Sequence, residues 1–299
     1  MNRLLIKKNQ FIRFVVLLLA VPCICGADAR GNNEVLVVGD TRLKPVVQVI
    51  AGIEEIMGRK VVVYAPDEVD GKLASLVEQH AARAVIALGR PSIDQALTLP
   101  PSVIVLYDLV VLPPPIDRPN TAGMYMGTPI REYLHLVSTY LPHLKNICVI
   151  ASPGVVRLLN DADPSQVTVY EVTNTYEFVE TVKNLEKADA VLLLPDLSLL
   201  TNKALEEIYL FSFREKVPLL GISKKHVREG SLFALEFDPE SSGRSLGMMA
   251  EAALKQQNSM RNQALPPRHF NLYINRNTAD KMGIAVPEAM LKKATQVYP

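Results

Sequence analysis

The sequence has few of the residues on which nucleic-acid binding depends. It contains no Trp among its 299 residues, aromatic side chains make up 6% of it, and its formal net charge is +1. Single-stranded nucleic acid is bound on stacked aromatic side chains, and all nucleic acid is bound by concentrated positive charge. We therefore expect no nucleic-acid partner.

Cysteine is equally scarce. Cys23 and Cys25 belong to an apolar run near the N-terminus, so Cys148 is the only cysteine in the remainder of the chain. A lone cysteine inside an apolar run is typical of a small buried side chain. The sequence therefore predicts no disulfide and no reactive thiol.

Motifs for cofactors and metals are missing as well. The chain has neither GxGxxG nor GxxxxGK[ST], which cradle nucleotide phosphates. Its histidines show no HExxH or similar spacing, so we expect them at the surface or at helix ends. We expect no cofactor and no metal. The five histidines are His80, His135, His143, His226 and His269.

Residues 1–29 differ in kind from the rest. Basic residues in the first 13 positions precede an apolar run that is too short to span a bilayer, and Ala-Asp-Ala follows. This pattern predicts a secretory signal peptide. Lipoprotein anchoring needs a small residue before the modified cysteine, whereas Pro22 and Ile24 stand there, so the pattern favours simple cleavage.

Alternating apolar runs and amphipathic stretches predict an α/β fold. In residues 187–254, three apolar runs alternate with two amphipathic stretches, as in a parallel sheet. The same alternation precedes residues 111–119, where four prolines break it, and resumes at residue 146. We expect the chain to cross between two lobes near this break. The predicted strands are 34–39, 60–64, 84–88, 102–107, 146–150, 166–171, 190–194, 217–222, 232–237 and 270–274.

Polar residues stand where the predicted strands end. Ligands of open parallel sheets bind outside these ends, beside helix N-termini. Asp, Ser and Thr are also preferred helix caps, so capping explains each of them individually as well as ligand contact does. The candidate ligand-binding residues are Asp40, Thr41, Arg90, Ser92, Asp108, Asp196, Ser198, Ser223 and Asp238.

Arg90 and two of the acids suit a zwitterion such as an amino acid. Arg90 can hold a carboxylate through two parallel hydrogen bonds, while Asp108 or Asp196 can receive an ammonium group. The alternative is that Arg90 pairs with Asp94, one helical turn further on.

The sequence GRSLG at residues 243–247 matches the nucleophile elbow of serine hydrolases. That elbow needs a strand that runs directly into the turn, but residues 238–242 intervene and place Ser245 inside a predicted helix. We expect Ser242 to cap this helix and the two glycines to permit close packing. The chain is therefore predicted not to be an enzyme.

Seven motifs follow one another along most of the chain. They are RPNTAG (118–123), LPHLKNICVIASP (141–153), KADAVLLLPD (187–196), EKVPLLGIS (215–223), VREGSLFALEFD (227–238), SSGRSLGMM (241–249) and NRNTADKMGIAVPEAMLKKA (275–294). In this order they resemble periplasmic substrate-binding proteins of ABC importers, in the subfamily that includes tryptophan and tyrosine binders.

The resemblance implies a type I periplasmic binding protein fold with two Rossmann-like lobes. The first lobe would comprise residues 30–125 plus 228–262, and the second residues 126–227 plus 263–299. In the family, the strand and helix of residues 232–254 return to the first lobe.

The resemblance also implies a function. A monomer in the periplasm would capture a small polar ligand, amino acid-like or anionic, between its lobes and deliver it to an ABC permease in the inner membrane. Family members usually have threonine in place of Arg90 and a TDP-like motif at residues 107–109. This departure motivates an alternative, a periplasmic ligand-sensing or docking protein that no longer serves transport.

Overall fold

The computed structural model describes residues 34–159, 165–255 and 262–299. Strands and helices alternate throughout these ranges, which confirms the predicted α/β class. The predicted signal peptide lies outside the described residues, together with Cys23 and Cys25. Within the described ranges, no helix is both long enough and apolar enough to cross a membrane.

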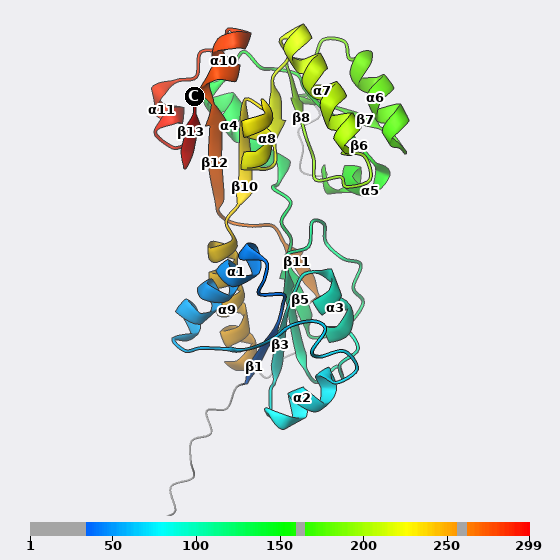
Figure 1. Ribbon diagram of the computed structural model, residues 1–299, viewed down its shortest axis with the longest axis vertical. Helices are drawn as coiled ribbons and strands as arrows, with labels where there is room; N and C mark the ends of the chain where they lie inside the picture. The colour runs from blue at the N-terminus through cyan, green and yellow to red at the C-terminus, as the bar shows by residue number, and fades with distance from the viewer. Residues whose placement is uncertain (1–33, 160–164, 256–261) are drawn as a thin grey trace, which may run out of the picture. The chain divides into compact units, whose positions relative to one another are not determined.

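The first sheet has six strands in the order β11-β5-β4-β3-β1-β2, and all of its pairings are parallel. Its inner strands are continuous apolar runs because helices cover both faces (Figure 1). The strands are β1 (Val35–Val38), β2 (Val62–Tyr64), β3 (Ala84–Leu88), β4 (Ile104–Asp108), β5 (Thr121–Met124) and β11 (Gln263–Leu265). The helices beside them are α1 (Lys44–Met57), α2 (Leu73–Gln79), α3 (Arg90–Ala96) and α9 (Pro239–Lys255).

The second sheet has seven strands in the order β13-β12-β10-β9-β8-β6-β7. Its pairings are parallel except between β10 and β12. The strands are β6 (Ile147–Ala151), β7 (Val167–Glu171), β8 (Ala190–Leu192), β9 (Leu219–Gly221), β10 (Phe233–Phe237), β12 (Phe270–Asn275) and β13 (Gln296–Tyr298). Its helices are α4 (Ile130–Tyr140), α5 (Pro153–Val156), the 3-10 turn η1 (Arg157–Leu159), α6 (Thr175–Lys183), α7 (Asn202–Glu215), α8 (Lys224–Glu229), α10 (Arg276–Met282) and α11 (Glu288–Leu291).

Strand β10 corrects one expectation. We expected it to join the first lobe together with the helix that follows, but it belongs to the second sheet, between β9 and β12. The reason is its pairing with β12, which places Phe233 and Leu235 in the core of that sheet, where Phe233 stacks on the ring of Tyr133. Conversely, β11 joins the first sheet, although residues 263–299 were expected in the second lobe. The exact lobe boundaries stay a prediction.

Helices α1 and α9 pack backbone against backbone, and glycines permit this approach. A Cβ atom at Gly243 would overlap the carbonyl group of Val49, and one at Gly52 would overlap the carbonyl oxygen of Glu240. A Cβ atom at Gly247 would lie 2.9 Å from Cβ of Ile56. The expectation that the glycines of GRSLG allow close packing is therefore confirmed.

The start of α9 corrects another expectation, because Ser242 does not cap this helix. Oδ1 of Asp238 accepts hydrogen bonds from the backbone N–H groups of Glu240 and Ser241, at 3.0 and 3.1 Å. Ser242 lies one turn inside the helix, where its Oγ donates to Oδ2 of Asp108 at 2.5 Å. The hydroxyl thus joins α9 to the end of β4.

Asp108 is a buried carboxyl group, with 1% of its surface exposed. Burial raises its pKa from 3.8 to about 6, although hydrogen bonds from Ser242 and from the backbone of Leu109 oppose the rise. At neutral pH the folded protein therefore holds an ionised carboxylate in an unfavourable environment.

We expect Gly243→Ala to lower the free energy of unfolding by about 1–3 kcal/mol, because the added methyl group forces α1 away from α9. Gly154→Ala is the matched control, since a Cβ atom there meets open space. Urea unfolding of both variants measures the difference. Equal stability of the two variants would contradict the packing described for these helices.

We also expect Asp108 to make stability depend on pH. Its pKa is raised by folding, so its contribution to stability is complete below pH 3.8 and is lost as the pH rises through about 6. The stability of the wild type relative to Asp108→Asn should therefore fall by about 3 kcal/mol between about pH 3.5 and about pH 7.5. Urea unfolding at a series of pH values tests this, and a difference that does not change with pH would refute it.

Candidate functional site: two adjoining cavities

Two cavities adjoin each other at the segment that follows β8. The polar cavity, of about 470 Å³, is lined by Arg90, Ser152, Asp196 and Ser198 together with mainly apolar neighbours. The apolar cavity, of about 290 Å³, lies on the other side of a wall that both share. The shared wall consists of Val111, Pro195 and Leu197.

Asp196 organises the polar cavity. Its Oδ2 accepts a hydrogen bond from the backbone N–H of Ser152 at 2.8 Å, and its Oδ1 accepts from the hydroxyl of Ser198 at 2.6 Å. Burial by itself raises the pKa of Asp196, but the hydrogen bonds from Ser152 and Ser198 outweigh it and hold the pKa below its ordinary value. Asp196 therefore remains ionised and joins the end of β6 to the segment that separates the cavities.

Arg90, the first residue of α3, brings a positive charge to the polar cavity. Its Nε lies 2.8 Å from Oδ1 of Asp94, so the pairing considered as an alternative is present. Both side chains are largely exposed, 64% and 53%, and exposed ion pairs of this kind contribute little. The pair therefore does not prevent the guanidinium from binding an anionic group in the cavity that it lines.

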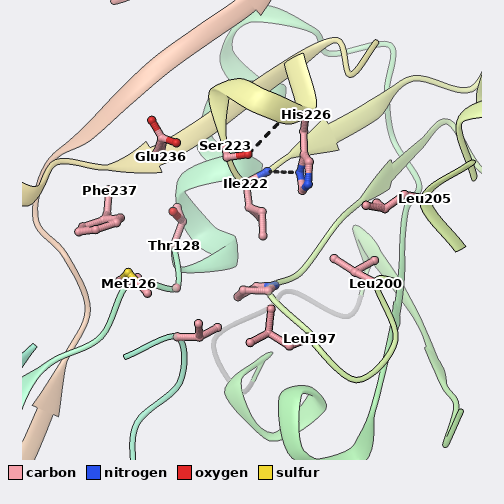
Figure 2. Close-up of a pocket in the computed structure, with 13 residues that line it drawn as sticks. Met126, Thr128, Leu197, Leu200, Leu205, Ile222, Ser223, His226, Glu236 and Phe237 are labelled. Atoms are coloured by element: carbon pink, nitrogen blue, oxygen red, sulfur yellow. Dashed lines mark hydrogen bonds between the residues drawn. The ribbon is translucent and has the colours of Figure 1, made fainter. Parts of the chain in front are cut away.

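The apolar cavity has a different chemistry. Figure 2 shows Ile222, Leu200 and Leu205 near the imidazole of His226, with Leu197 farther from it. Its polar lining residues include no Lys or Arg, and two of them, Ser223 and His226, come from the first turn of α8 and its cap. The complete lining is Val111, Met126, Gly127, Thr128, Pro195, Leu197, Leu200, Leu205, Ile222, Ser223, His226, Glu236 and Phe237.

His226 lies in the first turn of α8, as expected for a histidine at a helix end, but it is buried. It is 8% exposed, and its Nδ1 accepts a hydrogen bond from the backbone N–H of Ile222 at 3.3 Å. Its own backbone N–H donates to Oγ of Ser223, which caps α8. Burial lowers the pKa of His226 below its ordinary value, so the imidazole is neutral at physiological pH.

Tyr133 fixes the strands that form one side of the apolar cavity. Its hydroxyl lies 2.8 Å from the carbonyl oxygen of Gly221 and 3.2 Å from that of Leu235. The first carbonyl ends β9, and the second belongs to the middle residue of β10, next to Glu236, which lines the cavity. A buried tyrosine in α4 thus joins both strands beside the cavity.

The structure brings four of the nine predicted site residues to these cavities. Arg90, Asp196 and Ser198 line the polar cavity, and Ser223 lines the apolar one. The other five are described by the structure but do not line either cavity. Asp40 pairs with Arg42, Thr41 is exposed, Ser92 donates to the carbonyl of Leu88, Asp108 accepts from Ser242, and Asp238 caps α9.

Other residues of the cavities carried no signal in the sequence. Thr128 lies in the segment between β5 and α4, Phe237 is the last residue of β10, and Ser152 stands before a four-residue helix. Only His226 has a recognisable position in the sequence, because it follows the helix cap Ser223 by three residues. That spacing predicts a helix start but no cavity.

The arrangement is one for binding rather than for covalent chemistry. Ser245 lies within α9 and donates its hydroxyl to the carbonyl of Ser241, as expected for a helical serine. Among the described residues, no group of three or more His, Cys, Asp or Glu side chains is placed to hold a metal ion.

Solved structures share this fold. The ligand-free, open structure of CD0873, a substrate-binding protein with adhesive properties from Clostridium difficile, has a TM-score of 0.66 at 14% identity, over 88% of this chain and 98% of that one. An ABC domain in complex with L-Trp from Streptococcus pneumonia has a TM-score of 0.54 at 18% identity, over the same shares. These likenesses bear out the two Rossmann-like lobes of a type I periplasmic binding fold. No curated protein sequence matches the chain.

Sequence comparison supplies the family. The model of ABC transporter substrate binding proteins matches residues 110–298, which is more than half of the chain. This stretch includes the segment that separates the two cavities and the helix that carries His226. The chain belongs to the family of ABC transporter substrate-binding proteins, whose members bind their ligands without acting as enzymes.

Proposed function

We propose that the protein is the solute-binding component of an ABC-type importer, and that it captures a small polar ligand, amino acid-like or anionic, in the polar cavity. The observation that carries the proposal is the meeting of Arg90, Asp196 and Ser198 in one cavity of about 470 Å³. This volume is typical of small-molecule sites. The family supports an ABC transporter as the partner, and we propose that this partner is a permease in the inner membrane.

Arg90 is the group that recognises the ligand's anionic end. A guanidinium binds a carboxylate through two parallel, charge-assisted hydrogen bonds, which are stronger than its exposed contact with Asp94. The Asp196 carboxylate is already engaged with Ser152 and Ser198, so its role is to shape the cavity and to favour a ligand with a positive group nearby.

Capture leads to delivery through a shift in conformation. A ligand that contacts Arg90 in the first lobe and Ser198 in the second stabilises the state in which both contacts are made. The permease then recognises that state. We propose that this takes place in the periplasm, after removal of residues 1–29, and that the protein acts as a monomer.

The departure of Arg90 and Asp108 from the family pattern supports a second candidate function. In a periplasmic sensing or docking protein the same cavity would bind its ligand, but the ligand-bound protein would act on another membrane partner. Stimulation of the permease ATPase by the ligand-bound protein separates the two functions. It is expected for the importer component and not for the sensor.

We expect a polar ligand to raise the thermal unfolding midpoint of residues 30–299. The panel consists of amino acids, short peptides, nucleosides, sugars and small carboxylates, because binding to the native state stabilises it by mass action. Arg90→Ala should weaken the affinity for a hit by roughly 10-fold to 100-fold, since it removes charged hydrogen bonds.

Arg214→Ala is the control for this experiment. Arg214 is also exposed, 63%, and paired with an acid, but it lies in α7 outside the described lining of both cavities. Its loss should leave the affinity unchanged. A folded protein whose midpoint responds to nothing in the panel, or a hit that survives Arg90→Ala, would contradict the proposed site.

A further inference from the structure

We infer that the apolar cavity takes a neutral, apolar part of the same ligand, and that His226 recognises a hydrogen-bond acceptor on that part. The inference rests on the proposed function, because it assigns the ligand a second end beside the polar one. The ligand class is therefore amphipathic, with one charged or zwitterionic end and one uncharged apolar end that carries a carbonyl, ether or similar oxygen.

The hydrogen bond from Ile222 fixes the tautomer of His226. A backbone N–H can only donate, so Nδ1, which lies 3.3 Å from it, must carry a lone pair. In a neutral imidazole the proton is then on Nε2. The ring lines the apolar cavity, so it offers this N–H as a donor to whatever occupies the space (Figure 2).

Ser223 adds a second donor beside the imidazole. Its Oγ accepts the hydrogen bond from the backbone N–H of His226, which leaves its hydroxyl proton available. Two donors at one edge of the cavity favour an oxygen acceptor there.

The charges around His226 disfavour an anion in the apolar cavity. Glu236 of β10 lines it, and among the described lining residues there is no Lys or Arg. Lys225 and Glu229 of α8 act on the imidazole in opposite directions, while Tyr209 of α7 donates to its backbone carbonyl. An acceptor that binds here is therefore a neutral one.

The two cavities share a wall, so a single ligand can occupy both of them. Val111, Pro195 and Leu197 line both cavities, and Leu197 is 80% exposed between them. An exposed leucine at such a place loses water contact when an apolar group covers it. A ligand that passes Leu197 places its charged end near Arg90 and its apolar end near His226.

Two probes of similar size test the apolar end on the full mature chain. Acetophenone carries a carbonyl oxygen where ethylbenzene has a methylene group, so only acetophenone can accept a hydrogen bond. Water also hydrates this carbonyl, so the ratio of the two affinities is compared between the wild type and His226→Phe. NMR titration, with the imidazole nitrogens of His226 observed directly, should show the Nε2–H tautomer and a shift of that signal with acetophenone. The affinity for acetophenone relative to ethylbenzene should be roughly 5-fold to 10-fold higher in the wild type than in His226→Phe, and benzoate should bind no more tightly than ethylbenzene.

Variants of His226 separate recognition from folding. His226→Gln keeps an N–H donor near the position of Nε2 and should preserve the preference for acetophenone within about threefold, whereas His226→Phe removes the donor and should abolish it. His135→Phe, at an exposed position of α4, is the control and should change nothing. If His226→Phe fails to fold, the tautomer and the probe titration in the wild type still decide the inference.

The pH dependence of acetophenone binding gives a further reading. Protonation would place a hydrogen on Nδ1 against the N–H of Ile222, and burial lowers the pKa of His226 below its ordinary value. Affinity should therefore be constant around neutral pH and fall only at a pH below the ordinary pKa of an imidazole. An Nδ1–H tautomer, an affinity ratio of the two probes that His226→Phe leaves unchanged, or tighter binding of benzoate than of ethylbenzene would overturn the inference. A polar hit that depends on Arg90, with no response of His226 to acetophenone, would overturn this inference alone. If neither the ligand panel nor the acetophenone titration shows binding, the proposed function is overturned as well.

Discussion

The hydrogen bonds received by the Asp196 carboxylate hold the site together. They join the end of β6, through Ser152, to the segment between β8 and α7, through Ser198. That segment forms the wall between the two cavities, so its position decides the shape of both. A carboxylate that receives backbone and hydroxyl donors is a rigid support, since its charge is stabilised without a mobile cation. The proposed ligand capture depends on this wall.

Much of the fold could be predicted from the sequence because the strands of a parallel sheet covered on both faces are continuous apolar runs. Runs such as those of β3 and β6 are apolar throughout, and their buried positions show why. The sheet to which β10 belongs was not readable in this way. Phe233 and Leu235 would suit either core, and the choice is made by pairing with β12, a strand 33 residues or more further along the chain.

The candidate site was predictable only in part, because it too depends on contacts between residues that are distant in the chain. Position after a strand identified Asp196, Ser198 and Ser223, because loops at that edge converge. It also selected Asp108, whose partner Ser242 is 134 residues away and turns the carboxylate into a structural group. His226 was missed because its role follows from one backbone hydrogen bond, and a single histidine has no periodic pattern to reveal it.

The order of strands along the chain has a consequence for biosynthesis. The first sheet acquires its edge strand β11, and α1 acquires its neighbour α9, only after five strands of the second sheet have been made. The second sheet in turn waits for β12 and β13 at the end of the chain. Neither half can close its core as a nascent fragment, and such distant pairings form slowly. The chain therefore cannot complete either sheet until most of it has been synthesised, and we expect it to stay incompletely folded until then.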